Sequence, residues 1–255
     1  ITDQPARFIP GTCYMSNRSS YIVKRLGDCN IPSDIDRIST ETNHTCFNAD
    51  LQLYDFDEDR DTLIFMAHHD VLNTEFENFN DNSASVFLLM LLSNMFNGIE
   101  NLYYNLVVVF TDSEERSFWG ADRLKEQLDE GKFSKSKIIH IINLELCGIG
   151  NSMWVENHDN NDLVYDTGLE FFKGNSVGVI DTPNSDATFL RSQGVDNITT
   201  IGLLDSMYGE FDTSPWDVVH TVRDRYENGN LDDMKNLLHF LRDLVIEVND
   251  TYIEK

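Results

Sequence analysis

The chain has 255 residues, with 44 acidic and 19 basic side chains and a formal net charge of -25 at pH 7. So acidic a protein repels phosphate groups, which argues against a nucleic acid or anionic membrane partner and favours cationic groups such as a free amino terminus. No Pro/Gly/Ser-rich linker or internal repeat divides the sequence, so we predict a single domain over residues 1–255.

No segment reaches the roughly 18 apolar residues of a membrane span, and no charged-then-apolar signal segment opens the chain. Residue 1 is Ile rather than Met, so removal of a native leader stays open and no compartment is predicted. Four cysteines, Cys13, Cys29, Cys46 and Cys147, are too widely spaced for a zinc ribbon or a disulfide scaffold. One bridge among the first three fits the sequence about as well as free thiols, and Cys147 is expected to be a reduced core residue.

The hydrophobic pattern predicts alternating helices and strands. In chain order these are a helix over 16–26, strands over 45–54 and 62–67, a deeply buried helix over 83–96, a strand over 105–111, a helix over 117–130, and strands over 137–145 and 152–156. Further on come helices over 161–173 and 186–193, a strand over 197–203, a long loop over 205–230 and an amphipathic helix over 231–248. This alternation is typical of a doubly wound α/β fold.

Three of the apolar strands end in clusters of side chains that bind metals. The clusters are His68, His69 and Asp70 after residues 63–67, Glu114 and Glu115 after 106–110, and Glu145 after 138–142. Continuous apolar runs are typical of parallel strands buried on both faces, whose carboxyl ends border the ligand crevice of such sheets. Because zinc accepts imidazole and carboxylate ligands, the pattern predicts a metal site at this edge.

His68 and Asp70 form an H-x-D pair in which His68 can bind a metal while Asp70 accepts its other ring N–H. A solvated polar turn is the alternative interpretation. His69 is expected to point to the other side of the strand.

Asp81 precedes the apolar helix over 83–96. Position alone favours a helix N-cap, whereas the other candidate ligands together favour a carboxylate that bridges two metals. Glu114 and Glu115 fit the first turn of a helix electrostatically. Adjacent residues diverge there, however, so one can bind a metal while the other holds a proton as general base. Glu145 is either a further oxygen ligand or an exposed acid.

His220 lies in the long loop and is the candidate for a second imidazole. Most lone histidines are structural or solvated, and His220 stands out because the remaining histidines lack an acidic strand-end context. Loops of this length are more often functional than idle.

Taken in order, these residues resemble the di-zinc aminopeptidases of metallopeptidase family twenty-eight, which also contains the glutaminyl cyclases. The resemblance spans residues 63–224 and rests on six motifs: His68-His69-Asp70, Asn80-Asp81-Asn82-Ser83-Ala84, Asp112-Ser113-Glu114-Glu115 with Trp119-Gly120-Ala121, Asn143-Leu144-Glu145 with Cys147-Gly148, Ser185-Asp186 with Phe189, and His220-Thr221 with Asp224.

The resemblance implies an α/β fold, a three-layer α/β/α sandwich around a mixed, mostly parallel sheet. It implies that two zinc ions are bound, one by His68, Asp81 and Glu145 and the other by Asp81, Glu115 and His220. Glu114 would be the general base of an aminopeptidase that hydrolyses the N-terminal bond of a peptide with a free N-terminus. Tyr208 and Trp216, in the loop that carries His220, are the candidate substrate contacts.

Three positions depart from the family pattern. Glu145 stands where many members have Asp, Ala187 where His or another ring commonly follows the Ser-Asp pair, and Val219 where many members place an aromatic residue. The longer side chain of Glu145 is expected to affect metal spacing or preference.

Two alternatives remain. A glutaminyl cyclase would use a single zinc held by Asp81, Glu115 and His220, although the retention of His68 and Glu145 argues for the two-metal hydrolase. The other alternative is a catalytically weak binding or inhibitory protein that keeps the fold.

Overall fold

The computed structural model describes residues 17–39, 45–53, 56–72, 75–156, 162–172, 177–181, 184–207, 210–211 and 217–253. The helical elements are α1 (Asn17–Asp28), the π-helical η1 (Phe79–Ser83), α2 (Ala84–Phe96), α3 (Glu114–Ser117), α4 (Trp119–Asp129), α5 (Asp162–Phe171), α6 (Asp186–Ser192), the 3-10 helix η3 (Tyr226–Asn228) and α7 (Leu231–Ile253). The strands are β1 (Asp34–Ser39), β2 (Thr45–Gln52), β3 (Thr62–His68), β4 (Asn105–Thr111), β5 (Ile138–Leu144), β6 (Ser152–Glu156), β7 (Val177–Ile180), β8 (Ile198–Leu204), β9 (Ser206–Met207) and β10 (Glu210–Phe211).

Eight strands form one mixed sheet in the order β1-β2-β4-β3-β5-β8-β6-β7. The central strands β4, β3, β5 and β8 are mutually parallel, whereas β1, β2 and β6 introduce antiparallel pairs toward the edges. The parallel centre therefore places the carboxyl ends of β4, β3 and β5 side by side.

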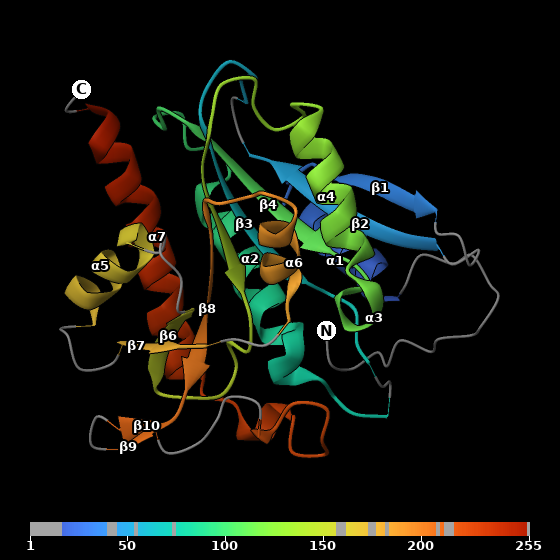
Figure 1. Ribbon diagram of the computed structural model, residues 1–255, viewed down its shortest axis with the longest axis vertical. Helices are drawn as coiled ribbons and strands as arrows, with labels where there is room; N and C mark the ends of the chain where they lie inside the picture. The colour runs from blue at the N-terminus through green and yellow to red at the C-terminus, as the bar shows by residue number, and fades with distance from the viewer. Residues whose placement is uncertain are drawn as a thin grey trace.

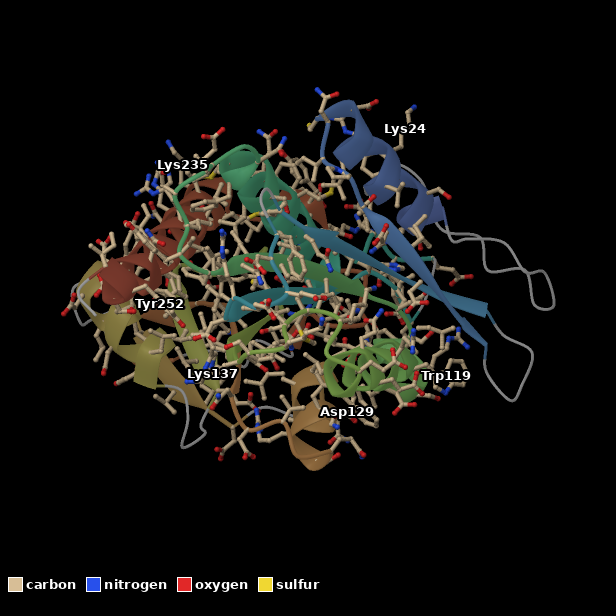
Figure 2. All side chains as sticks on the ribbon, turned by 90° about the horizontal axis from the view of Figure 1, so that it is seen from above. Lys24, Trp119, Asp129, Lys137, Lys235 and Tyr252 are labelled. Atoms are coloured by element: carbon tan, nitrogen blue, oxygen red, sulfur yellow. The ribbon has the colours of Figure 1, made fainter. Side chains whose placement is uncertain are left out.

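Helices cover both faces of the sheet. Because side chains alternate along a strand, Leu63 and Phe65 of β3 pack with α1, α2, α5 and α7, while Ile64 and Met66 pack with α4 and α6 on the other face. Figure 1 shows the helices around the sheet, and Figure 2 shows the sheet edge-on between α1, α2 and α7 on one side and α4 and α6 on the other. The predicted three-layer α/β/α sandwich is confirmed.

Several local predictions differ from the structure. The edge strands β1 and β7 were not predicted, because β1 is largely polar with Ile35 40% exposed and β7 has only four residues. The helix predicted over 117–130 is present as α4, and the short helix α3 precedes it as a separate element, since Phe118 adopts a left-handed conformation with φ 55° between the two. α2 buries its inward face as predicted, but Phe87 on its outer face is 45% exposed.

The two free cysteines among the described residues lie in different environments. Cys147 is free and buried, as predicted, and Cys29 is free and exposed; Cys13 and the side chain of Cys46 lie outside the described residues. Within the described part of the chain, no helix has the length and apolar character needed to cross a lipid bilayer.

Candidate metal centre

The site lies where three neighbouring parallel strands end. His68 is the last residue of β3, Glu145 directly follows β5, and β4 leads through Ser113 into α3, which opens with Glu114 and Glu115. The turn into α3 is sharp because Ser113 takes a left-handed conformation with φ 68°. Strand order therefore brings acids that are far apart in sequence to one edge of the sheet.

Asp81 reaches this edge from η1, the irregular turn that precedes α2. Its peptide bond to Asn82 is cis, and its carboxylate is buried with 7% of the side chain exposed. One oxygen, Oδ1, lies 3.2 Å from Nε2 of His68, and the other, Oδ2, lies 3.1 Å from Nε2 of His220. The carboxylate thus stands between the two imidazoles, in the geometry of a bridging ligand.

Two three-residue sets share Asp81. In the first, Nε2 of His68 also lies 3.3 Å from Oε2 of Glu145, and in the second, Nε2 of His220 lies 2.8 Å from Oε2 of Glu115. The ligand atoms within each set lie within 4.8 Å of one another. The first set is buried throughout, whereas His220 in the second is 40% exposed. The structure therefore brings together all five residues that the sequence suggested as ligands.

The residues present fit zinc. Each set offers one imidazole and two carboxylates, a donor combination that zinc accepts. Two ligand atoms about 2.1 Å from a tetrahedral ion lie about 3.4 Å apart, close to the nitrogen-to-oxygen distances above. The Oε1 atom of Glu115 is buried and has no hydrogen-bond partner among the described residues, so a cation would also satisfy it.

Burial and neighbouring charges shift the protonation of the cluster. Burial alone would lower the pKa of His68, but the carboxylates around it, Glu145 first, raise this pKa well above 6.5. A hydrogen bond with Asp81 raises the pKa of His220 to about 9. Burial tends to raise the pKa of Asp81, yet its hydrogen bonds with both histidines lower it below its ordinary value. These contacts favour the ionised carboxylate of Asp81 and the protonated imidazoles of His68 and His220.

Glu114 adjoins the two sets and belongs to neither. Its carboxyl group interacts electrostatically with His68 and with the carboxylates of Glu145, Asp186 and Asp70. Burial, reinforced by these like charges, raises its pKa to about 10. Glu114 can therefore hold a proton beside the candidate ligands.

Asp70 connects His68 to the start of α3. Its Oδ1 atom lies 3.3 Å from Nδ1 of His68, the ring nitrogen that faces away from the cluster. The same carboxylate accepts hydrogen bonds from the backbone N–H of Glu114 at 3.1 Å and of Glu115 at 3.3 Å. One side chain therefore orients an imidazole and the helix start that carries both glutamates.

Asp224 supports Asp81 from the loop that carries His220. It is fully buried and accepts hydrogen bonds from the backbone N–H of Asn80 at 2.5 Å and of Asp81 at 3.1 Å. Burial raises the pKa of Asp224 to about 6. The sequence motif His220-Thr221 with Asp224 thus supplies both a candidate ligand and a carboxylate that holds the backbone of Asp81.

Three residues near the site received no individual role from the sequence. Asn82 and Asn143 both donate to the carboxylate of Glu145; their places beside Asp81 and two residues before Glu145 were the only signal. Arg18 of α1 is 6% exposed and donates to the backbone oxygens of His69 and Glu77. A single arginine in a helix carried no signal of this role.

Of the remaining predicted side chains, His69 lies within the described residues and the two predicted substrate contacts do not. The ring of His69 lies 3.5 Å from the hydroxyl of Ser19 on α1, directed away from the ligand sets as the strand alternation predicted. Tyr208 and Trp216, the predicted substrate contacts, lie outside the described residues.

Comparisons with known proteins point to one family. The sequence profile of peptidase family M28 matches residues 53–245, more than half of the chain. No match is found among curated proteins.

Solved structures share the fold at low sequence identity. LapB from Legionella pneumophila is 15% identical with a TM-score of 0.76, over 97% of this chain and 69% of that one. BSAP, a zinc aminopeptidase from Bacillus subtilis, is 17% identical with a TM-score of 0.65, over 81% of this chain and 51% of that one. A glutaminyl cyclase from Porphyromonas gingivalis is 15% identical with a TM-score of 0.71, over 89% of this chain and 87% of that one.

Proposed function

Because this chain belongs to peptidase family M28, we propose that it is a zinc-dependent aminopeptidase that removes the N-terminal residue of peptides. The observation that carries the proposal is the pair of three-residue sets that share Asp81, with Glu114 beside them and outside both. A one-metal site would need only one of the two sets. We propose His68, Asp81 and Glu145 as ligands of one zinc ion and Asp81, Glu115 and His220 as ligands of the other.

The chemistry of hydrolysis divides between the metal and Glu114. Zinc supplies Lewis acidity and lowers the pKa of water from 15.7 to about 7. Glu114 takes a proton from the attacking water and then donates it to the leaving amine, which requires a carboxylate that is not consumed as a ligand. The position of Glu114 supports this role, because it adjoins both ligand sets and belongs to neither. The acidic surface attracts the free amino group of the substrate.

An assay of the purified protein tests the proposal. A panel of aminoacyl anilides and a peptide with an N-terminal glutaminyl residue are offered to the zinc-loaded protein, with and without a chelator. The proposal expects anilide release that the chelator abolishes and added zinc restores. If the zinc-loaded protein released no residue from either anilides or peptides, the aminopeptidase proposal would be wrong.

A second candidate function is glutaminyl-peptide cyclisation with a single zinc at Asp81, Glu115 and His220. It is favoured by the match in length with the Porphyromonas gingivalis glutaminyl cyclase, since each chain covers most of the other. The buried set of His68, Asp81 and Glu145 favours the aminopeptidase. In the same assay, ring closure of the glutaminyl peptide without anilide release would identify the cyclase. A catalytically weak binding protein would be silent in both assays, and elemental analysis of such a protein would find no transition metal.

A further inference from the structure

Glu145 is the candidate ligand whose length departs from the family pattern. Its backbone N–H donates to the backbone oxygen of Ile201 on β8 at 2.9 Å, so the main chain continues the sheet beyond β5. The side chain is buried, with 6% exposed. A buried carboxylate is costly unless hydrogen bonds and charges compensate it.

Asn82 donates to one oxygen of Glu145. Its amide nitrogen lies 2.8 Å from the backbone oxygen of Leu144 and 2.9 Å from Oε2 of Glu145. Because a backbone oxygen can only accept, the amide nitrogen must face it, and this fixes which way the amide group points. Asn82 is fully buried and directly follows Asp81. The same short turn thus positions two ligands of the first set.

Asn143 donates to the other oxygen of Glu145. Asn143 lies near the end of β5, two residues before Glu145, and its amide nitrogen lies 3.3 Å from Oε1 of Glu145 and 3.5 Å from the hydroxyl of Thr200. Asn143 is also fully buried. Both donors are neutral amides, which orient a carboxylate without adding a charge to an already crowded group of acids.

We propose that Asn82 and Asn143 are positioning residues that hold Glu145 as a ligand through Oε2 alone, and that the first set binds its metal ion only with this amide pair in place. Asn143 holds Oε1, while Oε2 accepts from Asn82 and also lies 3.3 Å from Nε2 of His68, which leaves its second lone pair for the metal ion. This inference rests on the metal centre of the proposed function and deepens it.

The second set does not include Glu145, so the two metal sites differ in what they require. Loss of the amide pair should impair the set of His68, Asp81 and Glu145 and spare the set of Asp81, Glu115 and His220. The amide pair therefore determines whether the protein holds two ions or one.

A metal titration of the double variant Asn82→Ala/Asn143→Ala tests this inference. Metal-free wild type and variant are titrated with zinc against a chromophoric chelator, and the metal content is measured by elemental analysis. Cobalt titration followed by visible absorption gives a second readout of each site. We expect two ions in the wild type, and in the variant a loss of about 10–100-fold in the affinity of one site, with the other affinity nearly unchanged.

Asn105→Ala is the matched control. Asn105 is a buried asparagine, 3% exposed, that donates to the backbone oxygen of Asp57 at the first residue of β4, the end of the strand opposite the metal centre. It should retain both ions. Where the double variant does not fold, as judged by circular dichroism, the single variants Asn143→Ala and Asn82→Ala take its place, and each is expected to weaken one site.

Three results would overturn the inference: a folded double variant that binds two ions as tightly as the wild type, one that loses both ions equally, or a wild type that binds one ion with an affinity that the variants leave unchanged. The outcome is separate from that of the proposed function. A wild type that binds two ions and hydrolyses no peptide would contradict the aminopeptidase and leave the role of the amide pair to be decided by the titration.

Discussion

Asp81 is the residue that both candidate metal sets share. Each of its oxygens faces a different imidazole, at 3.2 Å and 3.1 Å, and its backbone N–H is held by Asp224. The sequence placed Asp81 before an apolar helix, where a helix cap was the simpler interpretation. Its side chain makes no capping hydrogen bond among the described contacts, and Ser83 occupies the N-cap position of α2. The structure favours the bridging geometry over the cap.

Glu114 gives the sharpest prediction at the scale of one residue. Glu114→Gln keeps the size of the side chain and removes its ability to carry a proton, so we expect kcat to fall by about 10²–10⁴-fold. Zinc content should not change, because Glu114 belongs to neither ligand set. Steady-state kinetics on an anilide substrate, with elemental analysis of the same sample, measure both. A rate within a few fold of wild type would assign the base elsewhere.

At the scale of elements, α1 contacts two segments that carry candidate ligands. Arg18 lies in the first turn of α1, outside the segment that matches the family profile. Burial lowers its pKa to about 10, and the carboxylates of Asp70, Asp81 and Asp224 oppose that change, so Arg18 remains a cation at neutral pH. Its two backbone acceptors, on His69 and Glu77, precede Asp70 and Asp81 in the chain. The helix thus joins two ligand-bearing segments.

Replacement of Arg18 tests this connection. Arg18→Met keeps most of the packing volume, removes the positive charge and leaves two backbone oxygens without this donor, so we expect metal-free protein to lose about 1–3 kcal/mol in the free energy of unfolding. Lys24→Met is the matched control, because Lys24 points into solvent from the same helix (Figure 2); it should change stability by less than about 0.5 kcal/mol. Urea unfolding of both variants in chelator gives the comparison, and equal stabilities would refute the role of Arg18.

The strands at the sheet centre could be predicted from sequence because their apolar runs are uninterrupted. β3 and β4 are buried along their whole length, so their apolar runs located both the sheet centre and the ends that carry His68 and Glu114. Contacts made between distant segments left no such trace. Arg18 on His69 and Asn82 on Glu145 each join residues more than 50 positions apart, and their pairing follows from tertiary packing rather than from local pattern.

At the scale of the whole molecule, the cluster makes stability depend on pH. Burial raises the pKa of Glu115 to about 8 and of Asp186 to about 7, and hydrogen bonding to Asp81 raises that of His220 to about 9. A group with a raised pKa in the folded state stabilises the fold below its unfolded pKa and loses this contribution as the pH rises through the folded value. All three changes have the same sign.

We therefore expect metal-free protein to become less stable between about pH 5 and pH 9, and zinc affinity to rise over the same range because binding displaces protons. Thermal unfolding in chelator and zinc titration at several pH values measure the two trends. Metal-free stability that increases toward pH 9 would show that the cluster does not hold protons in this way. The net charge of -25 adds to the same trend, since self-repulsion grows as further protons leave.

Location of the metal ions in crystals grown with zinc tests the central claim most directly. Anomalous difference maps from data collected at the zinc absorption edge should show two peaks, one bounded by His68, Asp81 and Glu145 and the other by Asp81, Glu115 and His220. Both peaks should contact the carboxylate of Asp81. A map in which zinc lies away from both histidines, or in which no peak contacts Asp81, would contradict the account.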